Sequence, residues 1–219
     1  PRVEVEALML LVENRPATDL KRARCLLDRA YDVAVQPGNE STLAPVCLLA
    51  SQVARRSGDL DTALTQAKRA LNHVLSQGGL RRSRCEVEIA QTLIKLDRVD
   101  EAERHIRRAE QLSDRHENRF DSAACAYLRA NIARSRGDLA EAAQGYRDAT
   151  DRFSVIGDAN AWAMRAHLGL VLAEQGRLDE ASALFRSVLG APSPVGHLLA
   201  HLGSILTTAD DVDHRAFAQ

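Results

Sequence analysis

The sequence predicts an all-α fold: an α-solenoid in which about five antiparallel helix hairpins form a right-handed superhelix, followed by a C-terminal capping helix. Three observations predict it. A short turn motif recurs every 39 or 40 residues, small side chains recur at helical spacing after each turn, and only 4% of the residues are aromatic. Helices that pack through small and aliphatic side chains have this composition, whereas sheets seldom do.

The turn motif marks where each hairpin bends. Its clearest copies begin at Gly58, Asp97, Gly137 and Gly176, and a weaker copy begins at Thr18. Consecutive copies lie 39 or 40 residues apart, so one period covers nearly the whole chain. We expect each turn to end one helix and begin the next, because glycine supplies backbone freedom and aspartate accepts hydrogen bonds from the free amides of the new helix.

Small residues follow each turn at fixed distances. An alanine stands five residues after the first turn residue, a filler of variable size stands four residues further on, and a small or β-branched residue follows after three more. The three columns are Ala23, Ala63, Ala102, Ala142 and Ala181; Leu27, Ala67, Ile106, Tyr146 and Phe185; and Ala30, Ala70, Ala109, Ala149 and Val188. This spacing returns to one helix face, so the second helix of each hairpin should pack closely on the first.

Helix-breaking residues separate the hairpins. They are Pro37-Gly38-Asn39, Gly78-Gly79, His116-Glu117-Asn118 and Gly157-Asp158. Pro45 is expected near the start of its helix, where a missing amide donor costs little. The last segment, Pro192 to about Thr208, contains an apolar run that is expected to form one more helix. It either caps the fifth hairpin, which is the simpler choice, or docks onto a second copy of the protein as a homodimer.

The turn and alanine pattern, clearest from Gly169 to Phe185, resembles the tetratricopeptide repeat (TPR) over about five repeats. The usual TPR period is about 34 residues. The longer repeats here resemble those of bacterial signal-transducing ATPase regulators of the LuxR type and of peptide-pheromone receptors. The tryptophan expected early in each first helix is missing. The resemblance implies a TPR-like repeat domain over residues 1–190 and a capping helix and tail over residues 191–219.

Composition and charge limit the classes of function. Lys and Arg total 29 against 30 Asp and Glu, a formal charge of −1, so no overall field attracts nucleic acid or an anionic membrane. The chain shows neither a membrane-length apolar run nor the order of a signal peptide, which predicts a cytoplasmic protein. It begins with Pro1 in a helix-like pattern, and we therefore expect it to be processed or excised from something longer.

Patterns typical of catalytic and metal sites are missing. His197 and His201 stand four residues apart, a spacing that can bind zinc, but we favour solvated histidines because further ligands would follow a helix break. No glycine-rich phosphate loop or nucleophile motif occurs. We expect no enzymatic activity, no cofactor and no metal. The cysteines form no CxxC pair and are expected to be buried and structural: Cys25, Cys47, Cys85 and Cys125.

An arginine-rich stretch from Arg81 to Arg115 suggests nucleic-acid binding at first sight. Acidic neighbours largely cancel it, so we favour ion-paired helix surfaces and expect no direct contact with nucleic acid. Trp162 and Phe153 flank Gly157 and are expected to pack between repeats rather than stack on bases.

The first helices of the hairpins are expected to line the inner, concave surface. Counting back from the turns, an amide column of Gln52, Gln91 and Asn131 lies six residues before, and Arg55 and Arg134 lie three residues before. Amides donate and accept, so such a column can hold the backbone of an extended peptide, and the arginines can grip a carboxylate or phosphate. Tyr127 belongs to a less polar column ten residues before the turns, which could supply side-chain pockets.

These six residues form the candidate binding site, although residues of the same kind also simply solvate an exposed helix face. The polar columns end in the fourth repeat, where Leu170 and Ala173 take their places. The first hypothesis is a scaffold that binds a protein or peptide partner, one with acidic groups matching the arginines, in the concave groove. The alternative is the ligand-sensing module of a larger bacterial transcriptional or signalling regulator.

Overall fold

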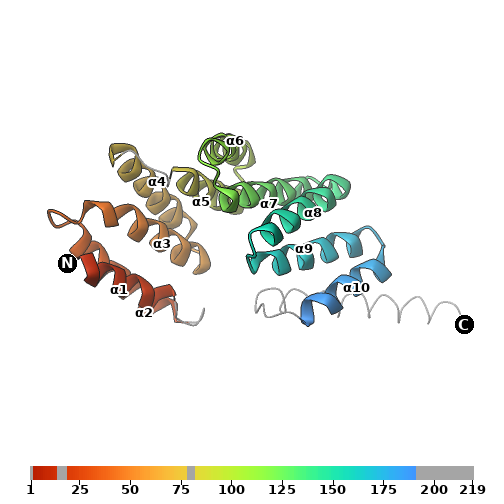
Figure 1. The fold of residues 1–219 in the computed structure, drawn as a ribbon, viewed down its shortest axis with the longest axis horizontal. Helices are drawn as coiled ribbons and strands as arrows, with labels where there is room; N and C mark the ends of the chain where they lie inside the picture. Colours follow the sequence, from red (N-terminus) through yellow and green to blue (C-terminus); the bar gives the residue numbers. More distant parts are fainter. Residues whose placement is uncertain (1, 14–18, 78–81, 191–219) are drawn as a thin grey trace, which may run out of the picture. The chain divides into compact units, whose positions relative to one another are not determined.

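The computed structural model describes residues 2–13, 19–77 and 82–190, and every regular element in these ranges is helical (Figure 1). The prediction of an all-α helical-repeat fold is confirmed. The α-helices within these ranges are α1 (Arg2–Glu13), α2 (Leu20–Ala34), α3 (Leu43–Arg56), α4 (Leu60–Gln77), α5 (Arg82–Lys95), α6 (Val99–Arg115), α7 (Arg119–Ser135), α8 (Leu139–Val155), α9 (Asn160–Glu174) and α10 (Leu178–Leu189). A short 3-10 helix, η1 (Glu40–Thr42), precedes α3.

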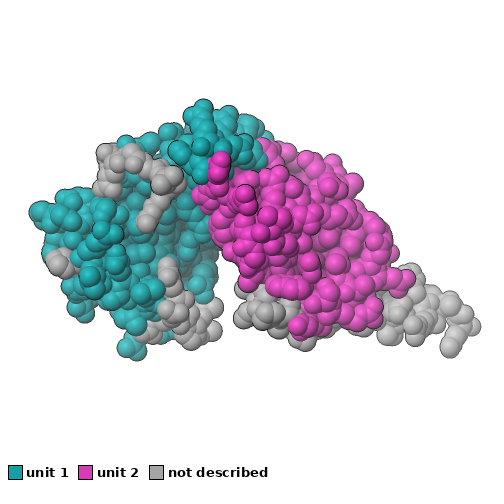
Figure 2. Space-filling view, in the orientation of Figure 1, with its two compact units in different colours: residues 1–116 teal, residues 117–219 magenta. Residues whose placement is uncertain are grey.

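The chain forms two compact units, which we call unit 1 (residues 1–116) and unit 2 (residues 117–219) (Figure 2). Unit 1 contains α1 to α6, and each of these helices packs on the next; α3 also contacts α1 and α5. Unit 2 contains α7 to α10, which pack on one another in the same sequential way. Within each unit, helices that are neighbours in sequence are therefore neighbours in space, as expected of stacked hairpins.

The three columns of residues predicted to follow each turn, which we call the stripe, form the packed face of the second helices. All fifteen of its side chains are buried, and none exposes more than 4% of its surface. The second helices begin at Leu20, Leu60, Val99, Leu139 and Leu178, so they keep the spacing of the turn motif.

The hairpin turns share one hydrogen-bond pattern. Gly58 has a left-handed φ of 82°, and its N–H donates to the carbonyl oxygen of Arg55 at 3.3 Å. The N–H of Asp59 donates to the carbonyl oxygen of Ala54 at 3.0 Å, which completes a Schellman motif. The turns at residues 97, 137 and 176 contain the same pair of bonds. At the first of these, Asp97 adopts the left-handed conformation at φ 58°, which is less favourable for a side chain than for glycine.

The predicted aspartate caps are present at two turns. The Oδ1 of Asp59 accepts from the N–H of Thr62 at 3.2 Å, and the Oδ1 of Asp138 accepts from the N–H of Glu141 at 2.9 Å. Each bond satisfies an amide that the first helical turn leaves without an internal partner. Arg98 takes the capping position of α6 and pairs instead with an acidic side chain of the first turn.

Gly169 allows α9 and α10 to approach closely. A Cβ atom at this position would lie 2.5 Å from Cε1 of Phe185, whose side chain is completely buried in the core of unit 2. The large filler on the second helix is therefore accommodated by the absence of a side chain on the first helix.

Three of the four cysteines fit the prediction of buried, structural side chains. Cys47, Cys85 and Cys125 are buried, and burial raises the pKa of the Cys47 thiol to about 11. Such a thiol is not activated as a nucleophile. Cys25 differs, because it lies on the outer side of α2 and is exposed.

Several predictions concern residues 191–219, which lie outside the described residues. They are the capping helix, the homodimer contact and the pair His197 and His201. Among the helices that are described, none is long and apolar enough to cross a membrane.

Candidate functional site on the first helices

The six residues predicted to bind a partner lie on first helices, three in each unit. Gln52 and Arg55 are on α3 and Gln91 is on α5, so these three belong to unit 1. The other three, Tyr127, Asn131 and Arg134, share α7 in unit 2. The positions of Tyr127, Asn131 and Arg134 along α7 differ by four and three residues, which places them on one helix face.

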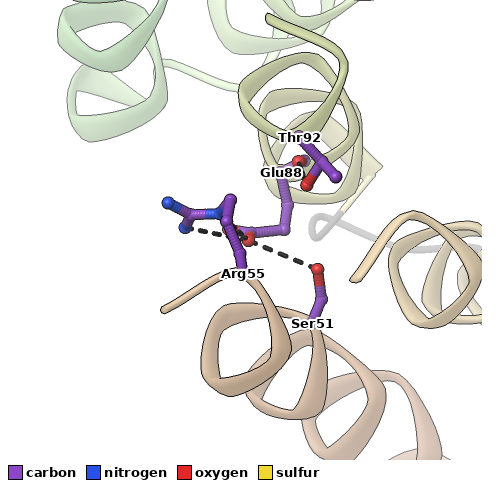
Figure 3. A network of polar contacts seen from close by, with 4 residues as sticks. All are labelled: Ser51, Arg55, Glu88 and Thr92. Atoms are coloured by element: carbon purple, nitrogen blue, oxygen red, sulfur yellow. Dashed lines mark hydrogen bonds and ion pairs between the residues drawn. The ribbon is translucent and has the colours of Figure 1, made fainter. Parts of the chain in front are cut away.

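In unit 1, Arg55 is held by a buried carboxylate of the next first helix (Figure 3). The Nε and Nη2 of Arg55 donate to Oε1 of Glu88 at 3.1 and 3.0 Å, and the hydroxyl of Ser51 donates to the same oxygen at 3.4 Å. The hydroxyl of Thr92 donates to the main-chain oxygen of Glu88 at 3.0 Å. Only 1% of the Glu88 side chain is exposed, against 19% of Arg55.

This network joins α3 to α5 and makes Arg55 costly to remove. A buried carboxylate without its partner typically destabilises a protein by about 3–5 kcal/mol. The guanidinium of Arg55 therefore stabilises the packing of neighbouring hairpins and is not available to a ligand unless this pair breaks.

The two predicted amides of unit 1, Gln52 and Gln91, are not engaged in such a network. Gln52 and Gln91 are half-buried on α3 and α5, which contact each other. Neither carboxamide makes a hydrogen bond with another residue in the described ranges. Each therefore offers a ligand both a donor and an acceptor.

In unit 2, Arg134 pairs with Glu174 of α9. The Nε of Arg134 lies 3.2 Å from each carboxylate oxygen of Glu174, and Nη2 donates to Oε1. Arg134 therefore reaches both carboxylate oxygens, whereas the two nitrogens of Arg55 share one oxygen of Glu88, and the exposure also differs. The side chains of Arg134 and Glu174 are 32% and 39% exposed.

Asn131 takes part in an aromatic cluster. Its Oδ1 accepts a hydrogen bond from the hydroxyl of the buried Tyr146 at 2.6 Å, so its amide nitrogen keeps two donors for other partners. The Tyr146 ring stacks on His167 of α9 with 5.4 Å between centroids, and Tyr127 lies 5.6 Å from the same imidazole. The cluster brings α7, α8 and α9 together around the predicted site residues.

Burial sets the protonation of this cluster. Burial, assisted by the charge of Arg134, lowers the pKa of His167 to about 4, so the imidazole is neutral at neutral pH. Its Nδ1 is buried without a hydrogen-bond partner among the described residues. Burial also raises the pKa of Tyr146 to about 12.

Sequence reasoning missed the partners of the two arginines. The only signal in the sequence is that each glutamate stands on a first helix, Glu88 between apolar residues of α5 and Glu174 at the end of the mostly apolar α9. The column to which Tyr127 belongs is mostly core, because Leu48, Val87 and Ala166 are buried. Tyr127 alone is partly exposed in that column.

The aromatic and arginine-rich residues of the sequence analysis make local contacts. Phe153 is buried and packs edge-on against Phe120 at 5.5 Å, and the guanidinium of Arg165 lies 4.5 Å from the Trp162 ring centre. In the arginine-rich stretch, Arg107 forms an ion pair with Glu103. The Phe pair joins the two helices of one hairpin, and the other two contacts lie within single helices, so none of them joins neighbouring repeats.

Two open pockets lie apart from the six predicted residues. One of about 340 Å³ is lined by α2, α3 and α4, with Asp28, Asp32 and Arg69 among its residues. Another of about 380 Å³ lies between α7 and α8, with Glu141 and Asp148 among its residues. Neither contains any of the six predicted binding residues.

A tetratricopeptide repeat family model matches residues 127–195. This match lies within the second half of the chain and spans 69 of its 219 residues, and it includes the stretch where the sequence pattern is clearest. No curated protein matches the sequence.

Solved structures extend the likeness to most of the chain. BtubC (BKLC) from P. vanneervenii has a TM-score of 0.64 at 17% identity, covering 84% of this chain and 78% of that chain. A Rap protein complexed with Competence and Sporulation Factor has a TM-score of 0.73 at 18% identity, covering 84% of this chain and 51% of that chain. The apo form of RapI has a TM-score of 0.62 at 17% identity, covering 91% and 68%.

At these identities the likeness shows the fold. The chain has a TPR-like helical-repeat fold, and it matches only about half the length of the Rap protein that was solved with its factor. The residues that bind a ligand have to be argued from this chain itself.

Proposed function

We propose that the chain is an interaction scaffold that holds a peptide segment of a partner protein on the inner faces of its first helices. The observation that carries this proposal is the pair Gln52 and Gln91. Both amides are half-buried on adjoining first helices, and neither has a hydrogen-bond partner in the described ranges. The Rap protein solved in complex with Competence and Sporulation Factor supports a binding role for this fold.

The chemistry of the amides favours a peptide main chain. Each residue of an extended peptide presents one N–H and one C=O, and a carboxamide can pair with both. Each such bond contributes about 0.5–1.5 kcal/mol, so loss of both glutamines should weaken binding about ten-fold or more. We propose further that the protein acts in the cytoplasm, catalyses no reaction and makes no direct contact with nucleic acid.

The test starts from a peptide selected from a random-sequence library against the full chain, with its Kd measured by fluorescence anisotropy. Gln52→Leu combined with Gln91→Leu should raise the Kd at least about ten-fold and leave the helical circular dichroism unchanged. Gln111→Leu is the matched control, because Gln111 is exposed on the second helix α6. Equal Kd values for the double variant and the control would contradict the proposal.

A second candidate function is the ligand-sensing module of a larger bacterial regulator. The likeness in fold to the Rap protein that was solved in complex with Competence and Sporulation Factor favours it. Binding of a ligand would shift an activity carried by another domain. An ATPase or DNA-binding domain encoded in frame with this sequence would support the sensor, and a gene encoding the repeats alone would favour the scaffold.

A further inference from the structure

We infer that Glu174 is an internal competitor for the ligand, and that the face of unit 2 formed by Tyr127, Asn131 and Arg134 binds a carboxylate that displaces it. This inference rests on the proposed function and adds the chemistry of the ligand. The partner group is either the C-terminal carboxylate of a peptide or the side chain of Asp or Glu.

The first argument compares the two arginines. Both hold an internal carboxylate through two guanidinium nitrogens, but Glu88 is 1% exposed and Glu174 is 39% exposed. Breaking the pair of Arg55 and Glu88 would leave a buried charge, whereas an exposed pair contributes only about 0.2–1 kcal/mol. A ligand can therefore displace Glu174 from Arg134 at little cost, while Arg55 stays committed to Glu88.

The second argument is the set of donors beside Arg134. The acceptor oxygen of Asn131 is occupied by the Tyr146 hydroxyl, so this amide presents its N–H groups. Tyr127, one helical turn away on the same face of α7, is partly exposed and carries a phenolic O–H. A guanidinium with amide and phenol donors on one helix face matches the acceptor-only chemistry of a carboxylate.

The third argument is that this cluster is not a closed structural network. The Nδ1 of His167 is buried and unpartnered, although buried polar groups in folded proteins are nearly always paired. His167 stacks on Tyr146, whose hydroxyl holds Asn131, so the imidazole is coupled to the donors of the site. When Glu174 is released, a shift of the side chains in this cluster would allow Nδ1 of His167 to form a hydrogen bond.

The test uses the full chain and three small probes: N-acetyl-alanyl-alanine with a free C-terminus, N-acetyl-aspartyl-alaninamide with only a side-chain carboxylate, and N-acetyl-alanyl-alaninamide with neither. Binding is followed by nuclear magnetic resonance at the Nε–H signal of Arg134, identified by its loss in Arg134→Lys. One or both acidic probes should shift this signal saturably, and the neutral probe should not. The acidic probe that binds more tightly identifies the source of the carboxylate.

The decisive variant is Glu174→Gln, which keeps the size of the side chain and removes its charge. It should tighten binding of the preferred acidic probe by up to about five-fold, which corresponds to the contribution of an exposed ion pair. Glu180→Gln is the matched control, because Glu180 is another exposed, arginine-paired carboxylate of unit 2, and it should leave the affinity at Arg134 unchanged. Equal shifts with acidic and neutral probes, or no gain in Glu174→Gln, would overturn the inference.

The scaffold proposal and the carboxylate-site inference can be refuted independently of each other. If the library-selected peptide depends on Gln52 and Gln91 but Glu174→Gln has no effect on the acidic probes, the scaffold survives and the carboxylate site does not. Unchanged circular dichroism and thermal unfolding of Glu174→Gln ensure that a null result is not caused by misfolding.

Discussion

At the scale of single residues, the amides of the inner faces differ in what they leave for a ligand. Gln52 and Gln91 keep both donor and acceptor, whereas Asn131 gives its acceptor to Tyr146. Unit 1 therefore presents groups suited to a peptide backbone, and unit 2 presents donors suited to an anion. This division comes from one hydrogen bond, which depends on the tyrosine that the second helix α8 supplies.

His167 gives a prediction on pH. Its pKa is about 4 in the folded chain and 6.5 when unperturbed, so between these values the unfolded state binds a proton that the folded state does not. The stability that depends on a neutral His167 is therefore fully present above about pH 6.5 and is lost progressively as the pH falls towards 4. Near pH 4.5 the loss from this residue should be about 2 kcal/mol.

The measurement compares urea unfolding at about pH 7 and 4.5 for the wild type and His167→Gln. The variant should lose about 2 kcal/mol less on acidification. His116→Gln, which replaces an exposed histidine, should lose as much stability on acidification as the wild type. Identical acid sensitivity of all three proteins would show that His167 is not held neutral by burial.

At the scale of elements, each hairpin is specified by its turn and its stripe. The Schellman bonds join residues three to five apart, and the stripe depends only on helical spacing, so both are visible in the sequence. Asp97 is the exception among the four clearest turns, because it holds a left-handed φ with a side chain.

Asp97→Gly should therefore stabilise the chain. Glycine adopts this conformation without the steric cost that the Cβ of aspartate incurs, so the free energy of unfolding should rise by about 0.5–1 kcal/mol in urea denaturation. Asp100→Gly, at the second residue of α6, should instead destabilise, because glycine is a poor helix former and the first turn loses an acidic side chain. A loss of stability in Asp97→Gly would mean that the aspartate side chain itself stabilises the turn.

At the scale of the whole molecule, the described helices divide between two units with separate internal packing. Unit 1 contains three hairpins, and its helices α1, α3 and α5 contact one another in succession. Repeat proteins are stabilised by contacts between neighbours, and three repeats suffice for a continuous core.

A fragment of residues 1–116 should therefore fold by itself. We expect helical circular dichroism and one cooperative thermal transition, since the hydrogen bonds that join Arg55 of α3 to Glu88 of α5 lie within the fragment. Hydrogen exchange would check that α3 and α5 are protected. A fragment with little helix would show that unit 1 needs the rest of the chain.

The sequence by itself determined the class of the fold, the positions of the turns and the buried stripe, because these features depend on residues less than three helical turns apart. It also indicated that Arg55 and Arg134 lie on first helices. Only the tertiary structure decided what these arginines touch. Glu88 and Glu174 lie 33 and 40 residues away along the chain, and whether they meet the arginines depends on how each helix is rotated about its axis. The burial of one carboxylate and the exposure of the other, which separate a structural pair from a displaceable one, follow from that packing.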